Sequence, residues 1–291
     1  MSSADALTRT AAPAWRSWLE LARVSNTPTV VSNAIAGAML ASLAAPAGTV
    51  ALVAAGLVLF YTAGMVLNDV LDEDVDRRQR PERPLPSGRV SRAAALAAVA
   101  GLFACGAGLL ALAGRAPLLA GLALIVLIVV YDAWHKGNPL SPLLMAGCRA
   151  LVYVVAGLAV ADALDRELWG AAAVLFVYVV GLTELAKAES GGIASRWPVL
   201  AVLAPAAYWA KDIASPEVAL LLAAFAAWAG WAVRLALVER RIGAAIARLI
   251  AGIALYDALV VAAAGGGAGA VAACACAFAA TVALQTRIAG S

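Results

Sequence analysis

Long apolar stretches, separated by short polar connections, run from residue 28 to near the C-terminus of the chain. Most of them reach about 18 residues, the length at which an apolar segment can span a bilayer as an α-helix. They are too long for barrel strands, and a spanning helix bonds all its own backbone groups. The pattern therefore predicts an all-α, polytopic membrane protein. The expected spans are 28–45, 50–69, 93–113, 117–134, 141–161, 168–186, 197–213, 217–237, 243–264 and 268–286.

The number of spans is predicted as nine or ten. The stretch 197–213 is short, and the boundary before the last stretch, within "AAAGGGAGAVA", is weak. No polar region is long enough to form an extramembrane domain. We therefore expect a polar N-terminal segment, residues 1–27, in the cytosol and a single transmembrane helical bundle over residues 28–291.

The composition agrees with this pattern, because 64% of the residues are hydrophobic and only 13% are charged. An ordinary soluble domain is about 45–50% apolar and about 25% charged. The N-terminal segment lacks the apolar core of a cleavable signal peptide, so the first span is expected to direct insertion. The four cysteines show no disulfide or metal-binding spacing, and the single histidine excludes a histidine-based metal site. No feature of the chain favours a nucleic-acid partner.

Basic residues follow every second predicted span. By the positive-inside tendency, these connections and the N-terminus face the cytosol, which for a bacterial protein means the inner membrane. Because they lie on one side, the connections can converge over one mouth of the bundle. The residues concerned are Arg77, Arg78, Arg80, Arg83, Arg89, Arg92, His135, Lys136, Lys187, Arg196, Arg240 and Arg241.

The segment "VLNDVLDEDVDRRQRPERPLPSGRV", residues 66–90, differs from the rest of the chain in its density of charge. Asn68, Asp72 and Asp76 have the spacing i, i+4 and i+8, so they share one face of a helix that continues out of the second span. Asp69 lies about 100° around that helix from Asn68. Carboxylates packed in this way repel one another unless a cation lies among them, and oxygen ligands of this kind suit Mg²⁺.

With Mg²⁺ bound, such a cluster becomes a clamp for a diphosphate. The arginines that follow it, and Lys136 on a neighbouring connection, can neutralise phosphate oxygens. The alternative interpretation is a solvated cytosolic loop of mixed charge, whose arginines serve only membrane topology.

The pattern N68-D69-x-x-D72-x-x-x-D76, followed by "ERPLPSGRVS", resembles the UbiA superfamily of intramembrane prenyltransferases. Arg83 and Gly88 lie within the segment that resembles the family's Arg-Pro-Leu-x-x-Gly sequence. "YDAWHK", residues 131–136, is similar to the family's Tyr-to-Lys cytosolic loop. The resemblance covers most of the chain, from about residue 20 to residue 200.

The resemblance implies a UbiA-like bundle that holds an isoprenyl diphosphate through Mg²⁺ between two aspartate-rich motifs. In such enzymes the diphosphate leaves and the allylic carbocation alkylates an acceptor, such as an aromatic ring or a lipid alcohol. Asp72, Asp76 and Lys136 would then be catalytic. The physics agrees, since cations favour diphosphate departure and an apolar cavity shields the carbocation from water.

This chain departs from the family pattern after the sixth span, where a second aspartate motif is expected. "GLTELAKAESGGIASRW", residues 181–197, contains no aspartate. Glu184 is placed to replace the first acid, but Glu189 lies about 140° away around a helix. Both can reach one metal only if the helix breaks near Ser190. Lys187 can instead contact phosphate directly.

Two candidate sets follow from the residues and the resemblance together. Arg149 is included because an arginine inside a membrane span usually faces a polar cavity. Asp257, also within a span, is left outside both sets because a structural role is as plausible. The diphosphate set is Arg83, Lys136, Arg149 and Lys187, and the Mg²⁺ set is Asn68, Asp69, Asp72, Asp76, Glu184 and Glu189.

Two functions remain open at this point. One is an integral-membrane, Mg²⁺-dependent prenyltransferase that uses an isoprenyl diphosphate and an aromatic or other small acceptor, which the sequence does not identify. The other is a non-catalytic relative that binds or carries a prenylated lipid or metabolite, for which the missing second motif is the main argument. A transporter is disfavoured because the charges lie at one membrane face.

Overall fold

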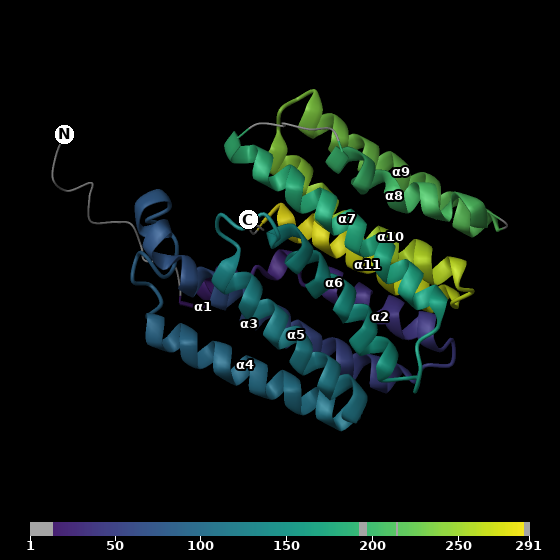
Figure 1. The fold of residues 1–291 in the computed structure, drawn as a ribbon, viewed down its shortest axis with the longest axis horizontal. Helices are drawn as coiled ribbons and strands as arrows, with labels where there is room; N and C mark the ends of the chain where they lie inside the picture. The colour runs from purple at the N-terminus through teal and green to yellow at the C-terminus, as the bar shows by residue number, and fades with distance from the viewer. Residues whose placement is uncertain (1–13, 192–196, 214, 288–291) are drawn as a thin grey trace.

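The computed structural model describes residues 14–191, 197–213 and 215–287, and over these residues the chain is helical with no β-strand (Figure 1). The all-α prediction is therefore confirmed. The helices are α1 Ala14–Leu21, α2 Pro28–Ala41, α3 Ala47–Gln79, α4 Arg92–Ala113, α5 Arg115–Trp134, α6 Ser141–Leu158, α7 Arg166–Gly191, α8 Trp197–Trp209, α9 Pro216–Leu237, α10 Ile242–Ala263 and α11 Ala268–Gln285, with 3-10 turns η1 Val24–Asn26 and η2 Ala210–Asp212.

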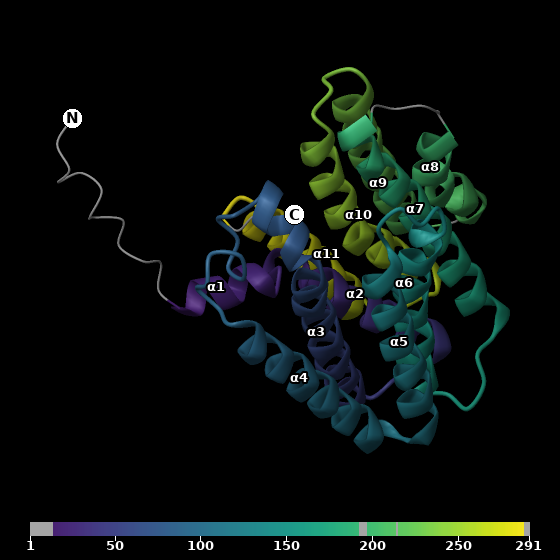
Figure 2. The same ribbon diagram turned by 60° about the vertical axis from the view of Figure 1, so that its left-hand side comes forward.

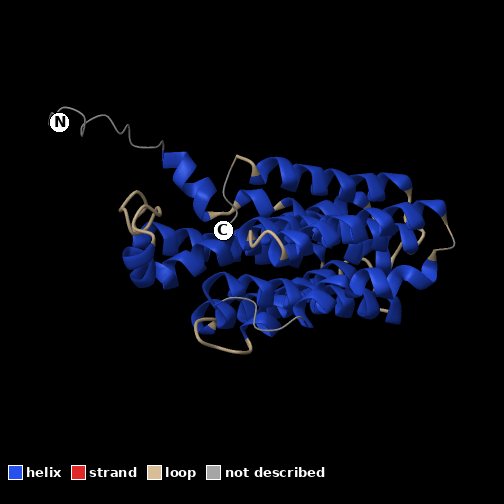
Figure 3. Ribbon diagram, turned by 90° about the horizontal axis from the view of Figure 1, so that it is seen from above, coloured by secondary structure: helices blue, strands red, loops and turns tan. Residues whose placement is uncertain are grey.

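Each of the ten predicted spans lies on one of the helices α2 to α11, and the helices run side by side with their connections at the two ends (Figure 3). Within the described residues, 8 of them are long and apolar enough to cross a membrane. The two shorter ones are α2, with 14 residues, and α8, with 13. A helix of that length extends about 20 Å, less than the roughly 30 Å of a hydrocarbon core.

The short helix α2 lies in the middle of the bundle, where it packs against α3, α6, α10 and α11 (Figure 2). Its polar residues Thr29, Ser32 and Asn33 are fully buried. A helix surrounded by other helices can carry such groups, because they find partners in protein rather than in lipid. Gly37 permits the closest approach, since a Cβ there would lie 2.5 Å from the carbonyl oxygen of Tyr153 in α6.

The largest apolar core lies among α7, α9 and α10, around the rings of Tyr178, Phe225 and Tyr256. The two tyrosine hydroxyls donate to backbone carbonyls of neighbouring helices, Tyr178 to Leu249 at 2.7 Å and Tyr256 to Ala171 at 2.8 Å. A buried hydroxyl needs such a partner. This half of the molecule is therefore a packed scaffold for the cavity described below.

The connection after α3 folds back against the N-terminal helix. Arg89 donates to the backbone carbonyl of Glu82 at 2.6 Å and to Ser17 of α1 at 3.1 Å. Arg92 donates to Glu73 at 2.9 Å and so ties the start of α4 to α3. At the same end of the bundle, Gln285 near the end of α11 donates to Asn26 of η1 at 3.1 Å.

Candidate active site

The motif acids occupy the last turns of α3. Asn68, Asp69 and Asp76 are buried, and Asp72 is largely so, although the helix is long enough to project past the membrane. The other face of these turns, which includes Val66 and Val70, packs against α4 in a separate apolar cluster. This packing keeps the helix regular through the motif, so the predicted common face forms.

Two arginines hold the inner part of the motif. Arg23 Nη2 donates to Asn68 Oδ1 at 3.3 Å and to Asp69 Oδ1 at 3.1 Å. Arg83 Nη1 donates to Asp76 Oδ2 at 2.8 Å and to Asp69 Oδ1 at 3.4 Å. Arg83, a predicted phosphate ligand, thus lies against the motif acids. Arg23, which precedes η1, was not predicted because it lies 45 residues before Asn68.

The connection after α5 supplies the partners of Asp72. Lys136 Nζ lies 2.5 Å from Asp72 Oδ1, and His135 Nε2 lies 3.5 Å from Asp72 Oδ2. The connection after α5 therefore reaches the last turns of α3. Lys136 stands where it can exchange the carboxylate for a phosphate oxygen.

His135 lies between two oxygen acceptors, because its Nδ1 is 3.0 Å from the carbonyl oxygen of Asp132. Only the imidazolium can donate at both nitrogens. The Asp72 carboxylate accordingly raises the pKa of His135 above its ordinary value of 6.5, while burial acts in the opposite direction.

Asp132 is a site residue that the sequence interpretation missed. It is buried in α5, and Asn68 Nδ2 donates to its Oδ1 at 3.2 Å. Its Oδ2 has no hydrogen-bond partner among the described residues. The sequence signal for it is "YDAWHK", in which Asp132 precedes Lys136 by four positions.

A cavity of about 310 Å³ opens beside the motif, with Arg23 and Asp132 in its wall. Most of its wall is apolar and comes from α3, α5, α6, α7 and α10. A mostly apolar chamber with a few charged groups in its wall suits a ligand that is charged at one end and apolar at the other. The lining residues are Arg23, Asn26, Val30, Leu57, Phe60, Tyr61, Gly64, Met65, Leu124, Ile128, Tyr131, Asp132, Met145, Cys148, Arg149, Val152, Val179, Leu182, Thr183, Ala186, Ile246, Ile250 and Ile253.

The end of α7 contributes small and apolar side chains to this cavity, including Thr183 and Ala186. Glu184 is not in the cavity wall, and its carboxylate pairs with Lys187 of the same helix at 3.0 Å. Among the described residues, Glu184 also forms no metal-binding group of three with the acids of α3. Glu189 belongs to α7, but its side chain lies outside the described residues.

The donors at the motif fit Mg²⁺ that arrives with a diphosphate. No three acidic, histidine or cysteine side chains among the described residues gather closely enough to hold a metal by themselves. Mg²⁺, however, usually takes only one or two carboxylates and completes its shell with waters and substrate phosphates. Asn68 and Asp69 each direct one oxygen at the same Arg23 nitrogen, so these oxygens already surround a cation.

Arg149 lies in the wall of the same cavity, on α6, and among the described residues it makes no hydrogen bond or ion pair with the motif acids. Its Nη1 donates to Asn33 Oδ1 at 3.0 Å, and its guanidinium lies 5.9 Å from the ring centre of Tyr61. Among the predicted phosphate ligands, the structure thus groups Arg83 and Lys136 with the motif and separates Arg149 from them.

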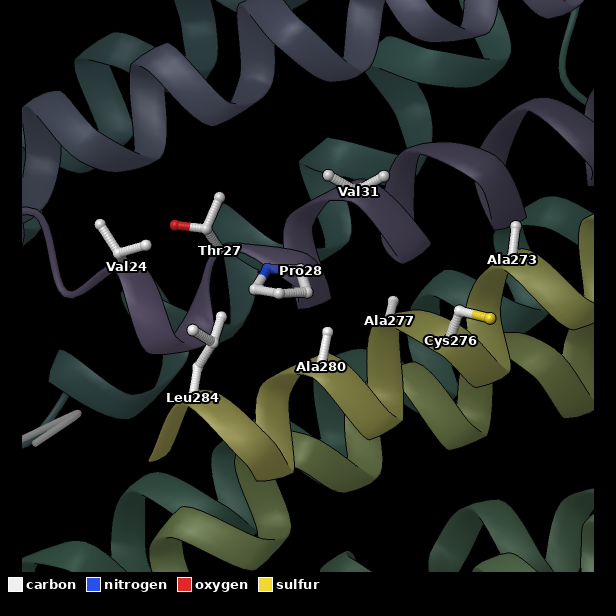
Figure 4. Close-up of a pocket in the computed structure, with 9 residues that line it drawn as sticks. All are labelled: Val24, Thr27, Pro28, Val31, Ala273, Cys276, Ala277, Ala280 and Leu284. Atoms are coloured by element: carbon white, nitrogen blue, oxygen red, sulfur yellow. The ribbon is translucent and has the colours of Figure 1, made fainter. Parts of the chain in front are cut away.

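A second hollow, an open groove of about 410 Å³, runs between the start of α2 and α11 (Figure 4). Its side chains are small or apolar, among them Val24, Val31 and Leu284, with no charged group. Without a charged or catalytic group, the groove is a poor site for the chemistry predicted here, and the cavity beside the motif remains the candidate.

Comparison with known proteins gives three findings. A family model described as "UbiA prenyltransferase family" matches residues 30–289. A Methanopyrus kandleri protein named digeranylgeranylglyceryl phosphate synthase is 36% identical over 126 residues, so the match spans 43% of this chain and less than half, 46%, of that relative. Solved structures of similar fold include a UbiA homolog from Aeropyrum pernix K1, with TM-score 0.68 and 22% identity over 81% of this chain and 97% of that one.

A UbiA homolog from Archaeoglobus fulgidus, solved bound to GPP and Mg²⁺, has TM-score 0.61 and 16% identity over 86% of this chain and 99% of that one. At these sequence identities, the likeness to the two solved structures shows a shared fold and nothing further.

Proposed function

The chain belongs to the UbiA prenyltransferase family, and from this premise we propose that it is an integral-membrane prenyltransferase that moves an isoprenyl group from an isoprenyl diphosphate to a small acceptor. The observation that carries the proposal is the contact of Asp72 in the α3 motif with Lys136, next to an apolar cavity. Two residues of the cavity wall, Arg23 and Asp132, bind Asn68 of the same motif. The homolog solved with GPP and Mg²⁺ supports it by analogy of fold.

Asn68, Asp69, Asp72 and Asp76 would hold Mg²⁺, which when bound supplies positive charge to the departing diphosphate. Arg83 and Lys136 would turn from their carboxylates to phosphate oxygens, because both already lie at hydrogen-bonding distance from the motif. The carbon–oxygen bond to the diphosphate breaks, the acceptor bonds to the allylic carbon, and the acceptor gives up a proton.

The apolar wall of the cavity would hold the isoprenyl chain and keep water from the allylic cation. Phe60 and Leu57 of α3 and Ile250 of α10 are parts of this wall. Asp72, Asp76 and Lys136 thus stay the proposed catalytic residues.

The roles of Glu184, Glu189 and Lys187 stay predictions. The Glu184 carboxylate pairs with Lys187 of its own helix, whereas Asn68 of the α3 motif contacts Asp132 of α5. This difference favours a site that relies on the α3 motif and on Asp132 rather than on a second acidic motif. The same observation is the argument for the second candidate function, a family member that binds a prenylated lipid without turning it over.

The protein is an integral membrane protein, given its spanning helices and its family. We further propose that the motif end of the bundle faces the cytosol, with the N-terminal segment on the same side, in a bacterial inner membrane. The support is the clustering of Arg77, Arg83 and Lys136 at that end.

The test is binding of geranyl thiodiphosphate, which does not hydrolyse readily, to the protein in nanodiscs with and without Mg²⁺. We expect Mg²⁺-dependent binding that is lost in Asp72→Ala and kept in Asp162→Ala, an exposed acid between α6 and α7. Pyrophosphate release in an acceptor screen then separates the two functions. A wild type that binds the analogue but never releases pyrophosphate favours the binder, and no binding at any chain length overturns both.

A further inference from the structure

A second polar cluster lies inside the bundle, away from the α3 motif. Its centre is Asp257 of α10, which is fully buried. The Asp257 carboxylate accepts hydrogen bonds from Ser32 at 2.5 Å, from Tyr153 at 2.5 Å, and from Asn33 at 3.0 and 2.8 Å. An intramembrane acid with this many donors is expected to have a purpose beyond packing.

The cluster fixes the orientation of one amide. Asn33 directs its Nδ2 to both carboxylate oxygens of Asp257, so its Oδ1 must point the other way. That oxygen accepts the hydrogen bond from Arg149 Nη1 at 3.0 Å. The approach of α2 and α6 at Gly37 keeps Tyr153 in the same cluster. Asp257 therefore sets the position of Arg149 without touching it.

Arg149 keeps most of its donors for the cavity. A guanidinium has five N–H groups, and among the described residues Arg149 donates one hydrogen bond, to Asn33, and forms no ion pair. The oxygens of Asp257 are already taken by three other side chains, so the arginine reaches only the amide oxygen. A cation in an apolar wall is costly without a direct anionic partner.

The position of Arg149 along α6 separates it from Lys136, a proposed ligand of the diphosphate. It follows the first residue of α6, Ser141, by eight positions, which corresponds to about 12 Å along the helix. Lys136 lies before that helix begins. An anion at Arg149 is thus a different group from the diphosphate at Asp72 and Lys136.

We propose that Arg149 is the anion-binding group for the acceptor, whose carboxylate or phosphate monoester pairs with it inside the cavity, and that Asp257 is a positioning residue that acts on Arg149 through Asn33. This proposal rests on the proposed prenyl transfer and names the class of acceptor. The planar fork of an arginine matches both anions.

The test uses three probes of similar size, benzoate, phenyl phosphate and neutral benzamide, with binding to the protein in nanodiscs measured by calorimetry. EDTA removes divalent ions, so that the metal site cannot bind the anions. We expect the wild type to prefer benzoate or phenyl phosphate to benzamide by about tenfold, as for one charged hydrogen-bonded pair. The anion that binds more tightly identifies the acidic group of the acceptor.

The variants separate this proposal from the proposed function. Arg149→Gln is expected to remove the preference for the anion while Mg²⁺-dependent binding of geranyl thiodiphosphate persists, and Lys136→Gln is expected to do the reverse. Arg149→Lys keeps the charge but loses the fork, so part of the preference should remain.

Asp257→Asn tests the positioning role. An amide at 257 brings its own N–H donors, so Asn33 is expected to turn its oxygen toward it and its NH₂ toward Arg149. The preference for the anion should then fall at an unchanged melting temperature, a result that a merely structural role does not give. A preference that survives in Arg149→Gln, or no preference in the wild type, overturns the proposal. Loss of thiodiphosphate binding in Arg149→Gln also overturns it, because Arg149 would then belong to the diphosphate site.

Discussion

Helices α3 and α7 both contribute to the wall of the cavity, and both carry acids that the sequence offers as metal ligands, but the surroundings of these acids differ. At α3, Asp69 and Asp72 are approached by Arg23, Arg83 and Lys136 from three other segments. At α7, Glu184 pairs with Lys187 within its own helix. An acid becomes part of a site where basic residues from other elements contact it. The spacing of acids along one helix does not show whether such contacts form.

The largest effect should come from removing the centre of the α3 cluster. Asp72→Ala deletes the partner of Lys136 and a proposed Mg²⁺ ligand, and we expect pyrophosphate release to fall at least about hundredfold. The measurement is single-turnover release in nanodiscs at saturating Mg²⁺. An activity within about threefold of that of the wild type would remove Asp72 from the mechanism.

A converse experiment introduces an acid on the part of α7 that lines the cavity. Thr183 lines the cavity and donates to the carbonyl of Val179 at 2.8 Å, one turn back. Thr183→Asp places a carboxylate where Glu184 does not reach, and we expect apparent Mg²⁺ affinity for analogue binding to rise by about tenfold. Thr183→Asn is the matched control, and an equal rise there would show that charge is not the cause.

A smaller effect concerns pH at the α3 end. The pKa of His135 is raised by the Asp72 carboxylate, so the imidazolium stabilises the folded state fully below the unfolded pKa, about 6.5. That stability is lost as pH rises through the higher folded pKa.

The contribution should be at most about 1 kcal/mol, because the pair is partly exposed. Melting temperatures of wild type and His135→Asn between about pH 6 and pH 9 check this. The wild type should lose more stability than the variant as pH rises, and parallel curves would refute the pairing.

The smallest effect is expected at α7 itself. Glu184→Gln breaks an i,i+3 ion pair at the helix surface, which contributes about 0.2–0.5 kcal/mol. We expect a nearly unchanged melting temperature and pyrophosphate release within about twofold of wild type. A loss comparable with that of Asp72→Ala would mean that α7 turns its acid into the site when substrate binds, and would erase the contrast between the two helix ends.

Much of the fold could be predicted, because apolar length and polar breaks mark each helix. The boundaries were less accurate where apolarity continues past the helix. The first span was predicted to reach residue 45, but α2 ends at Ala41 and Pro46 precedes α3. The seventh was predicted to reach residue 213, but after Trp209 the chain turns into η2. Composition does not register a change from α to 3-10 geometry.

The site was predictable only where its residues lie on one helix. The common face of Asn68, Asp72 and Asp76 follows from helical spacing, and α3 bears it out as a regular helix. Arg23 and Asp132 come from other elements, and their contact with Asn68 depends on packing that no local pattern contains. For the same reason the rotation of α7, which keeps Glu184 out of the cavity wall, could not be derived.

The short central helix α2 also has a consequence for the order in which the protein assembles. Ser32 lies 225 residues before its partner Asp257. At roughly 5–20 residues per second, a ribosome needs roughly 10 to 45 s to make that stretch of chain. During this time the buried polar residues Ser32 and Asn33 of α2 are without their partner on α10. The helix that enters first is thus completed last, so loss of α10 during synthesis should leave the N-terminal half inserted but unable to close around its centre.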